Sequence, residues 1–289
     1  MAGTPIGNDA LRRASEAGES AAAAIDAGRR VAALSVLAPL VDAAPGDPEL
    51  LALAATAARM AGRIDVARHV ADRLARLCGD KTARALAAAL GGGPAHAPAP
   101  SEDGSPVPFV LLDAALSPSD RDAIWDEAFG DYDAFAPATV IDDSGRHADD
   151  AVRSSRLLET AAGTALSVVD RVWAEIPRAA SAFAMGSVPR GHAEVQVTWH
   201  GHGDFFRCHQ DRPNDRVESI DGRRLSFVYY LARTPRRFAG GELRLYDWQG
   251  GRETWRKDRW TMITPEDNRL ALFPSDAFHE VMPIAVASD

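Results

Sequence analysis

The fold is decided by the stretch Trp199-His-Gly-His-Gly-Asp-Phe-Phe-Arg-Cys-His-Gln-Asp211. It begins at the end of residues 196–199, whose alternation and β-branched and aromatic side chains predict a strand. His209 and Asp211 stand two residues apart, and side chains at this spacing on an extended segment point to the same side. One metal ion could therefore contact both. An H-x-D pair arises easily by chance, so its surroundings decide whether it forms a site.

Three segments further along the chain have the composition of core strands: residues 224–231, 240–246 and 268–273. Short strands separated by turn signals predict an antiparallel sandwich or barrel. His279 begins one more strand, where it could meet His209 and Asp211 across that barrel. Two imidazoles and one carboxylate are the ligand set of the facial triad of non-heme Fe(II) oxygenases. Hydrolytic zinc sites can use the same set, which leaves zinc chemistry as a competing interpretation.

Four blocks of sequence follow one another in the order of a known family: residues 199–211, 223–231, 238–247 and 269–283. From about residue 107 onward the chain resembles the prolyl 4-hydroxylase-like branch of the 2-oxoglutarate/Fe(II) dioxygenase superfamily. The resemblance implies an α+β fold with a double-stranded β-helix (jelly-roll) catalytic domain over residues 108–289. Helices expected over residues 120–129 and 160–175 would buttress this domain.

The same resemblance implies that His209, Asp211 and His279 bind Fe(II) and carry the catalysis. 2-Oxoglutarate would be the co-substrate and O2 the oxidant, with succinate and CO2 released as the substrate is hydroxylated. Ascorbate would be a further cofactor. In such a site the iron and the co-substrate perform the chemistry, and the protein orients and shields them.

Four other residues are expected, by resemblance, to bind the co-substrate. Tyr230 matches the family position whose phenol hydrogen-bonds the distal carboxylate of 2-oxoglutarate; a core aromatic is the alternative, since aromatic residues are common in strands. Ser226 and Val228 alternate with Tyr230 on one strand face and would line the same pocket. Trp199 stands where the family often has a tyrosine, which suggests packing in place of a hydroxyl contact.

Other polar residues near the triad have simpler expected roles. Arg223 or Arg224 lies where relatives often contact substrate, but a solvated surface arginine is the favoured interpretation. His200 and His202 are expected to be turn residues and not metal ligands.

A basic residue that the family carries is absent from residues 284–289. In relatives it follows the second ligand histidine and pairs with the distal carboxylate of 2-oxoglutarate, an interaction that orients the anion strongly. We expect a C-terminal truncation, with this residue and the final barrel strand beyond Asp289. The alternative is that another arginine, such as Arg244, substitutes. A chain truncated in this way is expected to bind 2-oxoglutarate weakly.

Residues 1–90 differ from the rest: they are rich in alanine, nearly free of aromatic residues and helical by pattern. They repeat with a period of 34, at which Gly28-Arg29 recurs as Gly62-Arg63. This is the tetratricopeptide period, with glycine at the helix turn. The region therefore predicts an all-α, tetratricopeptide-like domain in which residues 49–61 and 64–77 form a helix pair.

Two interpretations of this helical domain are open. It is either a groove for a peptide or partner protein, or a generic helical array that packs on the catalytic domain. Pro39 is expected to kink one of its helices. The Gly/Pro/Ala-rich residues 91–107 are expected to form a flexible linker between the two domains.

Composition disfavours several classes of function. The net charge is −9, from 32 basic and 41 acidic residues, and no basic stripe is evident, which disfavours nucleic-acid binding. The chain lacks an apolar run of about 18 residues, so no membrane span is expected, and its start lacks the features of a signal peptide. Cys78 and Cys208 fall in different domains and give no disulfide framework. We expect a cytoplasmic protein.

Three functions compete. The leading one is an iron- and 2-oxoglutarate-dependent dioxygenase that hydroxylates a prolyl or other side chain of a protein or peptide, which the helical repeats would present. The second keeps this chemistry for a free amino acid or small metabolite. The third is an inactive barrel-plus-repeat binding scaffold, which the intact triad disfavours and the missing basic residue favours.

Overall fold

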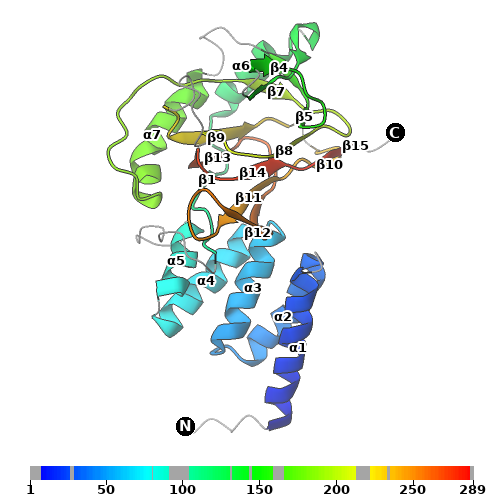
Figure 1. Ribbon diagram of the computed structural model, residues 1–289, viewed down its shortest axis with the longest axis vertical. Coiled ribbons are helices and arrows are strands. Elements are labelled where there is room, and N and C mark those ends of the chain that lie inside the picture. The colour runs from blue at the N-terminus through cyan, green and yellow to red at the C-terminus, as the bar shows by residue number, and fades with distance from the viewer. Residues whose placement is uncertain are drawn as a thin grey trace.

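The computed structural model describes residues 8–26, 29–79, 81–90, 104–130, 132–142, 145–158, 166–212, 222–232 and 235–286. Helices stack at the N-terminal end, and antiparallel sheets with further helices over them make up the rest (Figure 1). The chain is therefore α+β, as predicted.

The N-terminal region packs each helix against the next. Its elements are α1 (Asn8–Asp26), α2 (Arg30–Ala43), α3 (Pro48–Met60), α4 (Ile64–Cys78) and α5 (Lys81–Ala89). Small buried alanines of α3 let α2 and α4 approach it closely, namely Ala54, Ala55, Ala57 and Ala58. The predicted helices 49–61 and 64–77 are confirmed to within one residue at each end. Gly28, part of the predicted repeat, lies outside the described residues.

Local chemistry sets the ends of these helices. Asp47 caps α3 by accepting the N–H groups of Glu49 and Leu50 at 2.9 and 3.2 Å, and the proline that follows Asp47 suits a first turn that needs no N–H. Gly79 ends α4 with a positive φ of 61°, which glycine adopts without strain. α2 continues through Pro39, so this proline does not end the helix.

Antiparallel pairing organises the strands. The largest sheet has the order β12 (Trp255–Ile263), β11 (Leu243–Trp248), β14 (His279–Val281), β8 (Phe205–His209) and β5 (Arg153–Ser154). A second sheet contains β1 (Val110–Leu112), β13 (Arg269–Pro274) and β9 (Leu225–Tyr230), and a third β2 (Ala136–Pro137), β6 (Arg156–Leu158) and β7 (Val197–Trp199). Two-stranded sheets join β10 (Phe238–Gly240) to β15 (Ile284–Val286) and β3 (Val140–Asp142) to β4 (Gly145–His147). Every pairing described is antiparallel, as the turn-separated strands predicted.

A long helix, α7 (Leu166–Ala182), covers the sheet of β1, β13 and β9. Its buried Val168 and Val172 share one apolar cluster with Val110 of β1. The helix predicted over residues 160–175 is wrong at its C-terminal end. Its buried face includes Ile176, and the helix continues to Ala182. Residues 160–165 lie outside the described part of the chain.

A shorter helix, α6 (Pro118–Phe129), lies beside the third sheet, with the 3₁₀ turn η1 (Tyr132–Ala134) after it. Ser117 caps α6 by accepting the N–H of Asp120 at 3.2 Å. At its other end the Phe129 ring stacks on Phe135 at 5.7 Å and meets the edge of Trp199 of β7 at 5.4 Å. The predicted helix over residues 120–129 is therefore confirmed, with its start two residues earlier.

Residues 104–107 pack against the sheet region, although the sequence assigns them to a flexible linker. Ser105 forms an isolated bridge with Trp248, with N–O distances of 2.8 and 2.9 Å in the two directions. Val107 is fully buried. The backbone of this short segment is therefore held by β11.

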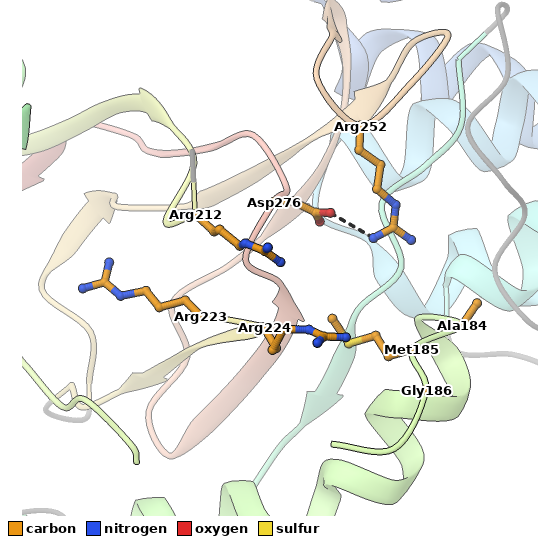
Figure 2. A pocket seen from close by; sticks show the side chains of 8 residues that line it. All are labelled: Ala184, Met185, Gly186, Arg212, Arg223, Arg224, Arg252 and Asp276. Atoms are coloured by element: carbon orange, nitrogen blue, oxygen red, sulfur yellow. Dashed lines mark hydrogen bonds and ion pairs between the residues drawn. The ribbon is translucent and has the colours of Figure 1, made fainter. Parts of the chain in front are cut away.

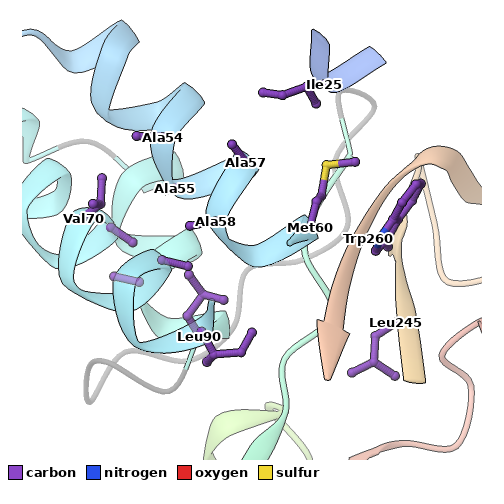
Figure 3. Packing of buried hydrophobic residues seen from close by; sticks show 14 of the residues in the cluster. Ile25, Ala54, Ala55, Ala57, Ala58, Met60, Val70, Leu90, Leu245 and Trp260 are labelled. Atoms are coloured by element: carbon purple, nitrogen blue, oxygen red, sulfur yellow. The ribbon is translucent and has the colours of Figure 1, made fainter. Parts of the chain in front are cut away.

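The helical region and the large sheet share one hydrophobic core (Figure 3). Figure 3 shows Met60 at the end of α3 lying beside Trp260 of β12, with Ile25 of α1 nearby. Within this interface Arg59 forms two hydrogen bonds of 2.6 Å with the carboxylate of Asp247, and each residue is only 3% exposed. Of the two interpretations of the helices, packing on the sheet region is observed; a groove for a partner stays a prediction.

Candidate metal centre

His209, Asp211 and His279 meet where β8 and β14 run side by side. β8 ends at His209, and antiparallel pairing places His279, the first residue of β14, opposite it. The next paired residues are Val281 and Phe206, and the register shift between the two pairs leaves one extra residue on β8. One ligand atom from each of the three residues lies within 4.8 Å of the others. The structure therefore brings together the triad that the sequence predicts.

Backbone carbonyls orient both imidazoles. His209 Nδ1 lies 2.8 Å from the carbonyl oxygen of Arg207, and His279 Nδ1 lies 2.9 Å from that of Ala277. Because a carbonyl can only accept a hydrogen bond, each Nδ1 carries a proton, and in the neutral imidazole the lone pair then lies on Nε2. The two Nε2 atoms face the carboxylate of Asp211 at 3.5 and 3.7 Å. Three donor atoms thus converge on one point.

The protonation states also suit metal binding. Burial, followed by the charge of the neighbouring His209, lowers the pKa of His279 to about 4, so His279 is neutral near pH 7. Burial alone would raise the pKa of Asp211, but His279, His209 and a hydrogen bond from Ser226 outweigh it and hold that pKa well below its usual range. The site therefore offers a neutral imidazole beside an ionised carboxylate.

Aromatic rings and a side-chain amide hold the three ligand residues in place. The Phe206 ring stacks on His209 with ring centres 3.6 Å apart, and Phe273 meets the edge of His279 at 4.9 Å. Gln210, between the first two ligands, donates its side-chain amide to the carbonyl oxygens of Asp276 and Arg252 at 2.6 and 3.2 Å. The segment that carries His209 and Asp211 is therefore held on both sides.

The residues expected to bind a co-substrate lie on β9. Ser226 is buried, donates to Ser275 at 3.1 Å and lies close enough to Asp211 to lower its pKa, so one end of this strand face adjoins the triad. Val228 and Tyr230 follow on the same face by alternation. The hydroxyl of Tyr230 is buried and has no hydrogen-bond partner among the described residues, and burial raises its pKa above the usual value. Such a hydroxyl can donate to an anionic acceptor that enters the site.

Trp199, the remaining co-substrate candidate, lies in the aromatic cluster with Phe129 and Phe135. His200 and His202 are not among the three ligand residues, and the backbone N–H of Gly201 bonds Asp204 at 2.7 Å, which is consistent with the predicted turn. His202 lies in a turn, as predicted, whereas His200 precedes that turn and is largely buried.

Arg244 does not face the triad, so the alternative that it replaces the missing basic residue is wrong. In the register of β11 and β14, Arg244 pairs with Glu280, whereas Leu245 pairs with His279. Successive residues of a strand point to opposite faces, which puts Arg244 on the face away from His279. Its guanidinium bonds Glu280 at 3.0 Å instead.

Arg153 is a residue of this centre that sequence reasoning missed. It lies on the edge strand β5, opposite Phe206 of β8, with its guanidinium 4.7 Å above the Phe206 ring. It is only 8% exposed; burial lowers its pKa, while the charge of Asp211 raises it. Burial, followed by the charge of Arg153, lowers the pKa of His200 to about 4. A two-residue strand gives no periodicity, so only the β5–β8 pairing could have revealed Arg153.

Comparison with known proteins agrees with this geometry. Residues 195–288, which contain all three ligands, match the model of the 2OG-Fe(II) oxygenase superfamily. This part of the chain is therefore similar to that superfamily. Its members imply Fe(II) and 2-oxoglutarate as cofactor and co-substrate, with O2 and a substrate as partners. Among the described helices, none is both long and apolar enough to cross a membrane.

Individual relatives have low sequence identity to this chain. An uncharacterized PKHD-type hydroxylase of Synechocystis sp. is 28% identical over 176 residues, which cover 60% of this chain and 55% of that protein. The chain thus spans about half the length of this curated relative. A solved structure of a Trichoplax adhaerens prolyl hydroxylase in complex with a hypoxia inducible factor peptide fragment is 21% identical in sequence, with a TM-score of 0.47. The match covers 62% of this chain and 78% of that chain. A Pseudomonas putida prolyl-4-hydroxylase has a TM-score of 0.44 and 20% identity over 61% and 85%.

Proposed function

We propose that this protein is an Fe(II)- and 2-oxoglutarate-dependent dioxygenase that hydroxylates a side chain of a protein or peptide. One observation carries the proposal: His209, Asp211 and His279 direct two imidazole nitrogens and a carboxylate to one point, in the protonation states that a metal requires. This donor set fits iron with open positions for other ligands. Bound there, Fe(II) and 2-oxoglutarate supply the oxidative decarboxylation that accompanies hydroxylation and releases succinate and CO2.

The residues of the chain have distinct roles in this proposal. The carbonyls of Arg207 and Ala277 hold the imidazole protons on Nδ1, so that Nε2 is presented to the metal. Ser226 lies beside Asp211 and helps to lower the pKa of its carboxyl, which keeps it ionised. Tyr230, whose hydroxyl is otherwise unpartnered, would donate to the distal carboxylate of 2-oxoglutarate. Val228 lies between them and would exclude water from the same face.

The fold proposed for this activity is a double-stranded β-helix over residues 108–289, preceded by a tetratricopeptide-like region over residues 1–90 and a linker over 91–107. The five-stranded sheet and the sheet of β1, β13 and β9 would be its two walls, since the chain passes from β8 to β9 and from β13 to β14 between them. The side chain hydroxylated is proposed to be prolyl, on the resemblance of the sequence blocks to the prolyl 4-hydroxylase-like branch.

The test is metal-dependent turnover of 2-oxoglutarate by the full chain. Release of succinate is expected with Fe(II) and a proline-containing peptide. His279→Ala and Asp211→Ala are expected to abolish it, and His202→Ala, which replaces an exposed histidine outside the triad, is the matched control. A chain that binds neither Fe(II) nor Mn(II), or ligand variants that release succinate as well as the parent, would contradict the proposal. Turnover with a free amino acid but with no peptide would retain the chemistry and refute the substrate class.

A further inference from the structure

A cavity lies beside the segment that carries Asp211, since the next residue, Arg212, lines it. It has a volume of about 180 Å³. The residues that line it are Ala184, Met185, Gly186, Arg212, Arg223, Arg224, Arg252 and Asp276 (Figure 2). Among the described residues, four arginines and one aspartate thus line the cavity, in a chain whose net charge is −9. The overall acidity of the protein makes this local excess of positive charge a specific feature of the cavity.

Fixed partners hold part of the arginine cluster in place. Arg252 bonds Asp276 at 3.0 Å and lies 4.6 Å above the ring of Trp248. Arg223 donates to Glu194 at 2.5 Å and to the carbonyl oxygen of Asp211 at 3.1 Å. Because these guanidinium groups are already oriented, a ligand would not have to order them on binding, and less entropy would be lost.

The cavity also holds a buried acceptor that lacks a donor. Oδ2 of Asp276 receives the bond from Arg252, but Oδ1 is buried and has no hydrogen-bond partner among the described residues. A buried polar atom of this kind is costly unless a ligand or water satisfies it. Figure 2 shows Asp276 among the side chains of Arg212, Arg224 and Arg252. A ligand that is anionic and also carries one O–H donor would satisfy both kinds of group.

We propose that this cavity binds a hydrogen phosphate group, from free phosphate or from a protonated phosphate monoester. Arginine is suited to this role because its planar fork donates two parallel hydrogen bonds to an oxyanion. The P–O–H group would donate to Asp276 Oδ1, and the remaining oxygens would accept from the arginines. This assignment goes beyond the proposed dioxygenase chemistry and does not depend on it.

The cavity wall is continuous with the metal-binding segment. Arg212 follows Asp211 directly, and its backbone N–H bonds the carbonyl of Ser275 at 2.9 Å. Gln210 bonds the carbonyl of Asp276 at 2.6 Å. Phosphate in the cavity would therefore lie against the same backbone that positions Asp211.

Calorimetry of the full chain with inorganic phosphate, at constant ionic strength and without added metal, tests the proposal. Saturable binding is expected. Arg224→Gln changes an exposed side chain at the cavity and is expected to weaken phosphate about tenfold, the loss of one charge-assisted hydrogen bond. Arg63→Gln, on an exposed arginine of the helical region, makes the same change in charge and is expected to leave the affinity unaltered. Thermal unfolding of both variants confirms that they are folded.

Two other anions test whether the cavity selects a hydrogen phosphate group. Sulfate has the shape of phosphate but carries no proton near pH 7, so Asp276 should repel it and phosphate should bind at least tenfold more tightly. Phosphoserine, titrated slightly below neutral pH, separates the two sources, because it binds only if the cavity admits an ester. Absence of saturable binding, an equal loss in Arg224→Gln and Arg63→Gln, or sulfate as tight as phosphate would each overturn the proposal.

Discussion

Replacing Arg59 by methionine is expected to lower the free energy of unfolding by about 3–5 kcal/mol. Arg59 and Asp247 are each 3% exposed, and two hydrogen bonds of 2.6 Å join them across the interface between α3 and β11. Methionine keeps much of the length of the arginine stem, so packing is largely retained. The cost arises because the Asp247 carboxylate would remain buried without a counter-charge. Thr261, whose hydroxyl lies 3.4 Å from Arg59, cannot neutralise it.

Urea unfolding of the full chain, followed by far-ultraviolet circular dichroism, measures this loss. For a chain of this size it corresponds to a fall in Tm of roughly 10 °C. The double variant Arg59→Met/Asp247→Asn is expected to be less destabilised than the sum of the single variants, since it leaves no unpaired charge. Arg63→Met is the matched control: its side chain is 59% exposed and should change stability by no more than about 0.5 kcal/mol. A loss below about 1 kcal/mol for Arg59→Met, or additive single variants, would refute the role assigned to this ion pair.

Three further predictions concern the site. His279→Ala should weaken Mn(II) binding, measured by calorimetry, by more than about 100-fold. Loss of a residue that only orients a metal ligand weakens binding by at most about that factor, so a smaller effect would show that His279 is not a ligand. Tyr230→Phe should weaken 2-oxoglutarate about tenfold without lowering stability, because its hydroxyl has no partner to lose in the free protein; equal affinities of the two proteins would contradict this. The pKa of His200 is about 4 in the folded chain and 6.5 in the unfolded chain, so the free energy of unfolding should fall by about 3 kcal/mol as the pH falls from 6.5 to 4, with none lost above pH 6.5. Urea unfolding of His200→Asn across this pH range should lack that contribution.

The His209–Asp211 pair was predictable because its geometry is local, and His279 was predictable because the resemblance of the sequence blocks supplied it. His209 and Asp211 need only an extended segment to share a side, and His279 needs only an antiparallel strand beside it. β8 and β14 supply both conditions. The bounds of α3 and α4 were predictable for the same reason, since an N-cap aspartate and a C-terminal glycine act within one helical turn.

Residues that act through distant partners were not predictable. Arg59 sits in an alanine-rich helix, where a single arginine reads as a solvated side chain, and its partner Asp247 lies 188 residues further along the chain. Arg153 belongs to a two-residue strand, and only pairing with β8 places it beside Asp211. The arginine cavity draws Arg252 and Arg212 from segments 40 residues apart, so no spacing rule connects them. In each case the tertiary pairing of strands or helices creates the contact.

The alternation of β14 connects the helical region to the triad. His279 faces the triad, whereas the next residue, Glu280, points to the other face and binds Arg244 and Tyr246 of β11. The guanidinium of Arg244 lies 4.4 Å above the ring of Trp260, and Arg30 of α2 covers the same ring at 3.8 Å. A chain of contacts therefore runs from α2 to the residue adjacent to a metal ligand. Because β14 has only three residues and little stability of its own, packing against β11 and the helices beyond it is what holds His279 in register with His209.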